Sequence, residues 1–212
     1  MEAETTKVIV ISGVSRGLGR ALALELAKLG HTIIGCSRDK IKLDSLQLQL
    51  SNASPRNHLL FNFDVKSNES IREMAQTVKE KFGSVDIIDT NMKGVANMLR
   101  HFIPLMLPKN KGIIVNVSSL YGRIAAARFQ MGIEGLSKSV AKELPNGLTI
   151  VTLDPGIINT DASVTILGHF ASQYQSPQLW ALKAAPMILN ITTADNGETL
   201  IVPDPGVLPH VY

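Results

Sequence analysis

The chain has little of several residue types, and each scarcity excludes a class of protein. Its 212 residues include one cysteine, Cys36, which excludes an internal disulfide framework and a cysteine-rich zinc site. No apolar run is long enough to span a bilayer, and the sequence does not open with a basic segment followed by an apolar one. We therefore expect neither a membrane span nor a signal peptide, and a reducing, cytoplasmic location by default.

Strong charge of one sign is lacking as well. The formal net charge is +3, and the basic residues are scattered rather than gathered in one run, so a nucleic-acid partner is not expected. The histidines lie far apart in the sequence and form no metal-ligand spacing, which predicts no metal site. They are His31, His58, His101, His169 and His210.

The sequence does contain a regular alternation of short β-branched runs with longer segments of helical period. This pattern predicts a Rossmann-like, doubly wound parallel sheet in a three-layer α/β/α arrangement, as a single domain over residues 1–212. Strands are expected at Lys7–Ser12, Thr32–Cys36, His58–Phe63, Val85–Ile88, Gly112–Val117, Leu148–Leu153 and Thr199–Val202. Helices are expected near Gly17–Leu29, Lys40–Leu50, Ser67–Phe82, Met92–Leu107, Ile133–Leu144 and Leu179–Leu189.

Three glycines follow the first predicted strand, in the segment Ser12-Gly13-Val14-Ser15-Arg16-Gly17-Leu18-Gly19. Glycines between a strand and a helix allow a tight turn and let the backbone approach a pyrophosphate closely. The N–H groups and dipole of the following helix favour the same anion. A plain turn with incidental glycines is the alternative, but the strand before and the helix after favour nucleotide binding.

The end of the second predicted strand indicates which dinucleotide is bound. NAD sites place an acidic residue there for the ribose hydroxyl, whereas this strand ends Cys36-Ser37-Arg38. Arg16 and Arg38 could together bind a phosphate, which favours NADP(H); the alternative is two exposed arginines. The neighbouring Asp39 is either a helix N-cap or a weak ribose ligand.

With these motifs the chain resembles the short-chain dehydrogenase/reductase family over nearly its whole length. The glycine turn resembles the family's TGxxxGxG motif, Asp64-Val65 resembles the pair that contacts the adenine, and Asp154–Thr160 resembles the PGxxxT segment at the nicotinamide end. The resemblance implies a cofactor site made by Gly13, Ser15, Arg16, Gly17, Leu18, Gly19, Arg38, Asp64, Val65, Pro155, Gly156 and Thr160.

The resemblance extends to catalytic positions. Val115–Ser119 resembles the strand that ends in the family's catalytic serine, and Asp89–Gly94 resembles the segment that carries its catalytic asparagine. The family's catalytic serine therefore corresponds to Ser119, and its catalytic asparagine corresponds to Asn91. The implied activity is hydride transfer between NADP(H) and a small carbonyl or alcohol substrate.

Two departures from the family pattern weaken that expectation. The family has a Tyr-x-x-x-Lys pair after the serine, but none of Tyr121, Tyr174 and Tyr212 is followed four residues later by lysine. Anchored on the downstream Gly135–Lys138 segment, the tyrosine position falls near Ala126 and the lysine position near Gln130. Without a positioned acid, proton transfer is expected to slow by about 10²–10⁴-fold.

The second departure lies at the end of the fourth predicted strand. Here Ile88 is followed directly by Asp89–Asn91, with no connecting segment between them. Family members have a turn, a loop and the start of a helix here, about thirty residues, and the stretch Ala125–Gln130 is about six residues shorter than in the family. Adding both gaps back would restore an ordinary domain length. We interpret the chain as internally shortened, with part of the strand 4–helix 4 region missing. An alternative transcript, a gene-model error and a degenerate paralogue all stay open.

Two functions remain open on these grounds, beside a third interpretation in which the chain folds poorly and has no function of its own. One is an NADP(H)-dependent oxidoreductase impaired in catalysis. The other is a nucleotide-binding pseudoenzyme or non-catalytic partner of intact family members, with association, including homo-oligomers, through helices 92–107 and 133–144. The segment Ala162–Gln175 is either an apolar lid over the substrate or a plain packed helix.

Overall fold

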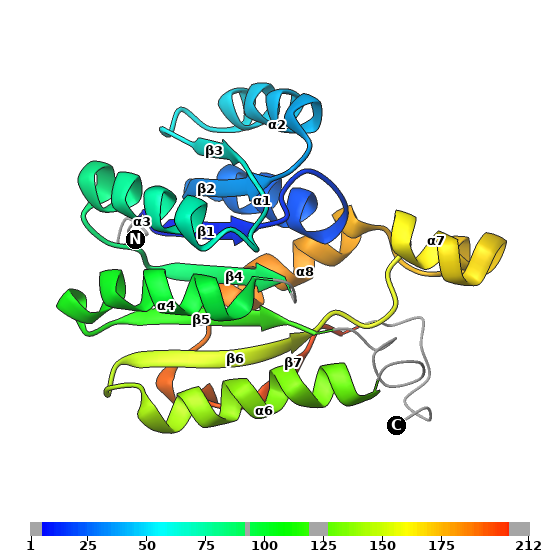
Figure 1. The fold of residues 1–212 in the computed structure, drawn as a ribbon. Coiled ribbons are helices and arrows are strands. Elements are labelled where there is room, and N and C mark those ends of the chain that lie inside the picture. Colours follow the sequence, from blue (N-terminus) through cyan, green and yellow to red (C-terminus); the bar gives the residue numbers. More distant parts are fainter. Residues whose placement is uncertain (1–5, 92–93, 119–126, 204–212) are drawn as a thin grey trace, which may run out of the picture.

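The computed structural model describes residues 6–91, 94–118 and 127–203, with the backbone alone described at 89–91 and 127–131. They form a seven-stranded sheet in the order β3-β2-β1-β4-β5-β6-β7, in which every neighbouring pair is parallel. Helices cover both faces of the sheet (Figure 1). The predicted Rossmann-like α/β fold, with its three layers, is confirmed.

Strands and helices alternate along the chain as the sequence predicts. The strands are β1 (Val8–Ser12), β2 (Thr32–Ser37), β3 (Leu59–Asn62), β4 (Ile87–Asn91), β5 (Gly112–Val117), β6 (Leu148–Asp154) and β7 (Thr199–Ile201). The α-helices are α1 (Gly17–Lys28), α2 (Lys40–Ala53), α3 (Asn68–Phe82), α4 (Val95–Met106), α6 (Ala127–Glu143), α7 (Asp161–Leu167) and α8 (Pro177–Leu189). Short 3-10 segments are η1 (Leu107–Lys109), η2 (Gly168–Gln173) and η3 (Thr193–Asp195).

The core has two halves, one on each face of the sheet, because successive side chains of a strand point to opposite faces. In β1, Ile9 and Ile11 belong to the half formed with α1, α2 and α8, while Val10 belongs to the half formed with α3 and α4. Trp180 of α8 and Phe102 of α4 are fully buried in these two halves. In Figure 1, α3, α4 and α6 lie in front of the sheet and α1 and α8 behind it. Both faces are covered, as parallel sheets require.

The predicted end of the fourth strand is wrong. We expected the strand to stop at Ile88 and Asp89 and Thr90 to form the connection to the next helix. Instead β4 continues to Asn91, and Asp89–Asn91 pair in register with Val115–Val117 of β5. The cross-strand hydrogen bonds to β5 outweigh the weak strand propensity of the polar residues Asp89 and Asn91. Helix α4 accordingly begins at Val95 rather than at Met92.

Two helix predictions also need correction. Helix α6 begins at Ala127, six residues before the predicted Ile133, and α8 begins at Pro177, where Ser176 caps it by accepting a hydrogen bond from the Leu179 N–H. Helix α7 begins at Asp161 and continues into the segment Ala162–Gln175, where the sequence left a lid and a helix open. Thr160 and Ser163 form a reciprocal capping box at its start. Among the residues described, no helix is both long and apolar enough to cross a membrane.

His58 is a titratable group built into the edge of the core. It is 5% exposed, and its Nδ1 atom accepts a hydrogen bond of 3.1 Å from the backbone N–H of Ile33 in β2. Burial disfavours the charged imidazolium and lowers the pKa of His58 below its ordinary value of 6.5. Protonation would also remove the acceptor that the Ile33 N–H uses.

We therefore predict that the folded state loses stability in mild acid. A histidine whose pKa is lower in the folded than in the unfolded state contributes fully above the unfolded pKa of 6.5 and loses that contribution as the pH falls through the folded value. Urea unfolding between pH 8 and pH 5 measures the effect. His58→Asn, which keeps an acceptor but does not titrate, should flatten the dependence, and an equally steep slope in this variant would contradict the assignment.

Candidate functional site

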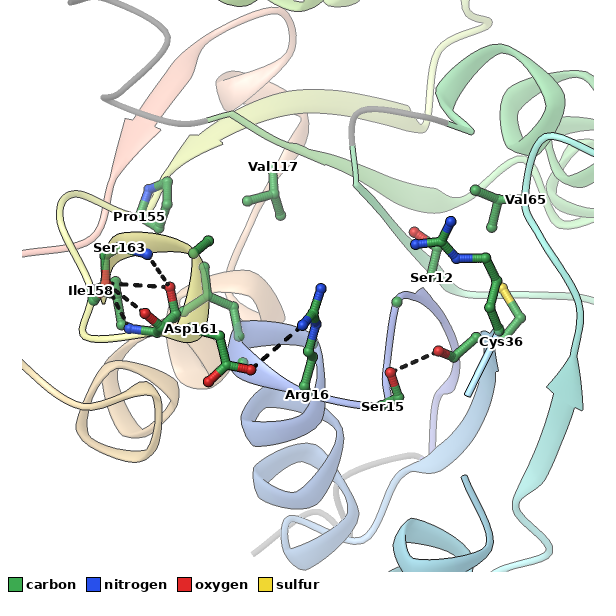
Figure 2. A pocket seen from close by; sticks show the side chains of 18 of the residues that line it. Ser12, Ser15, Arg16, Cys36, Val65, Val117, Pro155, Ile158, Asp161 and Ser163 are labelled. Atoms are coloured by element: carbon green, nitrogen blue, oxygen red, sulfur yellow. Dashed lines mark hydrogen bonds and ion pairs between the residues drawn. The ribbon is translucent and has the colours of Figure 1, made fainter. Parts of the chain in front are cut away.

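A cavity of about 660 Å³ opens at the carboxyl ends of β1, β2, β5 and β6. It lies where the connection from β1 and the connections from β4 and β5 leave the sheet toward opposite faces, the usual ligand position in doubly wound sheets. All twelve residues predicted to bind the cofactor line it: Gly13, Ser15, Arg16, Gly17, Leu18, Gly19, Arg38, Asp64, Val65, Pro155, Gly156 and Thr160. Figure 2 shows the glycine turn facing the β6–α7 segment across this space.

The glycine turn has a backbone that other residues would not adopt easily. Gly13 has a φ of 73° and Gly17 a φ of 56°, both in the left-handed region that favours glycine. The Gly13 N–H donates to the carbonyl of Cys36 at 2.9 Å, which ties the turn to β2. A Cβ atom on Gly19 would lie 2.7 Å from the carbonyl oxygen of Gly13, so the turn closes tightly on the start of α1. Because the Arg16 side chain does not cap α1, the first N–H groups of that helix remain available to an anion.

The end of β2 provides hydroxyl groups and a helix cap. Ser37 donates from its Oγ to the Oγ of Ser15 at 2.7 Å, which joins β2 to the glycine turn (Figure 2). Asp39 caps α2 by accepting a hydrogen bond of 3.1 Å from the Lys42 N–H, and this bond is the main reason that the pKa of Asp39 is lowered. Of the two alternatives for Asp39, the structure therefore supports the N-cap.

Both arginines predicted to bind phosphate are paired with carboxylates at the edge of the cavity. Arg16 Nη1 lies 3.5 Å from Asp161 Oδ2, and Arg38 Nη1 lies 3.6 Å from Asp64 Oδ2. The Arg16 and Arg38 side chains are 64% and 70% exposed, so water screens both pairs and each stabilises the fold little. Both guanidinium groups can therefore exchange these partners for a stronger anion.

A second pocket of about 550 Å³ adjoins the first and shares four residues with it. Its lining contains the cations Arg16, Arg38, Lys40 and Lys42 together with the hydroxyl groups of Ser15 and Ser37. Sequence reasoning missed Lys40, Lys42 and Ser37 as members of the site. They were within its reach, because residues just after the carboxyl end of a strand face the ligand in such sheets.

The opposite end of the cavity is formed by β5, β6 and α7. Val117 contributes from the end of β5 and Ser118 directly after it, and Ile158, Ser163 and Ile166 contribute from the segment after β6. The Ser118 hydroxyl is buried and has no hydrogen-bond partner among the described residues. The segment after Thr160 contains a helix, and on α7 and η2 the apolar side chains of Val164, Ile166 and Phe170 are exposed.

The predicted catalytic residues are placed only in part. Asn91 ends β4 with its backbone paired to Val117, at the cavity edge of the sheet, and its side chain is not described. Ser119, Tyr121 and Ala126 lie outside the described residues, and Gln130 is described only as backbone within α6. Their catalytic roles stay predictions.

Neither a reactive thiol nor a metal centre is found in the described part of the chain. Cys36 lines the cavity but is fully buried, and burial raises the pKa of its thiol to about 12. The described ranges bring together no group of histidine, cysteine, aspartate and glutamate side chains that could hold a metal ion. Binding at this site therefore rests on backbone N–H groups, hydroxyls and basic side chains.

The sequence of the chain is similar to those of known reductases. It is 51% identical, over 227 aligned positions that take in 92% of this chain and 93% of the relative, to an NADPH-dependent pterin aldehyde reductase of Arabidopsis thaliana. It is 29% identical to a 3-oxoacyl-(acyl-carrier-protein) reductase of Staphylococcus aureus, with 79% of this chain and 81% of the relative aligned.

The fold also matches solved structures. The L-sorbose reductase of Gluconobacter frateurii, solved with NADPH and L-sorbose, superposes with a TM-score of 0.83 at 19% identity, over 93% of this chain and 95% of that one. At this identity the likeness extends to the fold alone. The sequence profile of short chain dehydrogenases matches residues 7–88 and 86–167, most of the chain. The chain therefore belongs to the short chain dehydrogenase family.

Proposed function

We propose that this chain binds NADP(H) in the cavity and has the family's carbonyl-reducing site, with slow turnover of its own. The observation that carries the first part is the set of four cations around the second pocket, Arg16, Arg38, Lys40 and Lys42, where NAD-specific sites have an acid. Asp39, the one carboxylate among them, is occupied by capping α2 and by an ion pair with Lys42. A dianionic ribose phosphate fits this charge, and a free ribose hydroxyl does not need it.

The lining of the larger cavity is consistent with the rest of the dinucleotide. The glycine turn and the uncapped N-terminus of α1 suit a pyrophosphate, and the approach of Gly19 to Gly13 leaves no side chain in its way. NADPH, when bound, supplies a hydride to a carbonyl carbon. Pro155, Gly156 and Thr160 would hold its nicotinamide end, and Ile166 on α7 would cover the substrate.

The name of the plant relative supports an aldehyde as the substrate, and pterin aldehydes are the first compounds to test. Hydride delivery to an aldehyde makes an alkoxide, which needs a positioned proton donor as it forms. The full sequence contains no Tyr-x-x-x-Lys pair. Slow turnover follows, because Ser119 and Asn91 do not supply a proton near neutral pH.

Two observations support the proposal that the chain is internally shortened. The family profile matches in two segments that meet at residues 86–88, the place where the fourth-strand motif breaks off. The alignment with the plant reductase spans 227 positions, whereas 92% of a 212-residue chain is well short of that number. This difference in length supports the proposal that residues present in the relative are lacking in this chain.

The missing pair also favours a second candidate function, a nucleotide-binding partner of intact family members. The surfaces proposed for this association, and for homo-oligomers, are residues 92–107 and 133–144, which contain α4 and most of α6. Equilibrium sedimentation of the pure chain, alone and with an intact relative, tests it. A chain that stays monomeric in both conditions would contradict it.

We predict that NADPH binds more tightly than NADH, measured as cofactor fluorescence in parallel titrations. Arg38→Asp should weaken NADPH binding by about tenfold or more and NADH binding much less, because it removes a charged hydrogen-bond donor and adds repulsion to the phosphate. Arg56→Asp, on the α2–β3 connection and outside both pockets, is the matched control. Equal affinities for the two cofactors in the wild type would refute the NADP(H) assignment.

We predict that Asp161→Asn tightens NADPH binding a few-fold. Asp161 pairs with Arg16 at the cavity edge, so the substitution removes both a competitor for the guanidinium and a negative charge near the phosphates. The gain should shrink as salt is added, since the groups are exposed. Glu73→Gln, an exposed charge removal on α3, is the control. Unchanged affinity in Asp161→Asn at low salt would show that the pair does not compete with the nucleotide.

We predict negligible oxidation of NADPH in the presence of aldehydes, ketones and quinones, pterin aldehydes included. The turnover rate should be lower by a factor on the order of 10²–10⁴ than in a family member that has a positioned acid. Ser119→Ala and Tyr121→Phe are measured beside the wild type. Robust turnover that Tyr121→Phe abolishes would identify Tyr121 as the proton donor and overturn the prediction.

A further inference from the structure

We propose that Arg20, which lines neither pocket, is the positioning residue that fixes the geometry of the cationic pocket around Arg16, Arg38, Lys40 and Lys42. The inference rests on the proposed NADP(H) function. Arg20 lies in the first turn of α1, directly after the last glycine of the turn, and is half-buried. It has no role in the cofactor motifs taken from the sequence.

One guanidinium group joins three segments of the chain. Its Nη1 atom donates to the carbonyl oxygens of Ser15 at 3.3 Å and of Lys42 at 3.0 Å. Its Nη2 atom donates to Ser45 Oγ and to Gln49 Oε1, both at 3.0 Å. Arg20 therefore ties the glycine turn to the first three turns of α2.

These partners belong to the two sides of the cationic pocket. Ser15 and Arg16 of the glycine turn form one side, and the segment from Arg38 to Lys42 forms the other. The sides meet directly at the hydrogen bond between Ser15 and Ser37. Arg20 provides a second link, from the Ser15 carbonyl to the Lys42 carbonyl, and so sets how far apart the cations of the two sides lie.

Arginine is required for this link because its planar fork holds several donors in fixed directions. Lysine has a single nitrogen on a flexible chain and cannot reach both backbone carbonyls and both side-chain acceptors at once. The same spacing matters for the ligand. A ribose phosphate has to contact cations from both sides of the pocket, whereas a free ribose hydroxyl needs neither. Loss of Arg20 should therefore act mainly on the cofactor that carries the phosphate.

The first test compares NADPH and NADH binding in Arg20→Ala, Arg20→Lys and the pair Ser45→Ala/Gln49→Leu. We expect NADPH affinity to fall about tenfold in both Arg20 variants and less in the pair, with a much smaller change for NADH. The control is Arg56→Ala, which removes an exposed arginine whose Nε donates to the Gly30 carbonyl at 3.1 Å, far from the pocket along the chain. Equal losses of affinity for the two cofactors, or no loss for either, would show that Arg20 does not position the cationic pocket and has only a structural role.

A second test needs no nucleotide. Amide hydrogen exchange of the unliganded protein should become faster at residues 13–19 and 39–43 in Arg20→Lys than in the wild type, and should not change there in Arg56→Ala. Unchanged exchange in these segments would overturn the positioning role. A wild type that binds neither cofactor would refute the proposed function, and the exchange result would still decide whether Arg20 holds the two segments together.

Discussion

The parallel pairing of β1 with β2 on one side and with β4 on the other determines where this protein can bind a ligand. Because the chain leaves β1 and β4 toward opposite faces, no connection crosses the carboxyl ends of the two strands, and a cavity forms there. The glycine turn, the basic end of β2 and the β6–α7 segment all meet at this edge. Their chemistry depends on the sheet, since only the strand register brings residues 13, 38 and 156 into one lining.

The sequence predicted this arrangement well where local chemistry and tertiary structure agree. Buried β-branched strands flanked by helices of regular period are recognisable without a structure, and so is a glycine turn that needs positive φ at Gly13 and Gly17. The predicted end of β4 was wrong, because the polar residues Asp89–Asn91 continue the strand by pairing with the backbone of β5. At α7 the sequence left a lid and a helix open, because this helix begins with a capping box and has no long apolar stripe.

The groups of the candidate site that belong to a motif were predicted from the sequence, whereas the groups that support the motif were missed. All twelve predicted cofactor residues share one cavity, yet Lys40 and Lys42 were missed, because a basic residue on an exposed helix turn looks like ordinary surface. Arg20 was missed for a different reason: its partners Ser15, Lys42, Ser45 and Gln49 come together only when α1 packs beside α2. At the nicotinamide end the reverse holds, since the absence of a tyrosine–lysine pair is plain in the sequence alone.

The burial of Cys36 has a practical consequence for handling the molecule. As the sole sulfhydryl in the chain, it is fully buried near the carboxyl end of β2, under the lining of the cavity, with a thiol pKa of about 12. Alkylating reagents attack the thiolate, so they reach this sulfur only when the structure opens locally around β2 and the glycine turn. The rate of alkylation therefore reports the opening of this part of the cavity, with no engineered label and no second thiol in the chain.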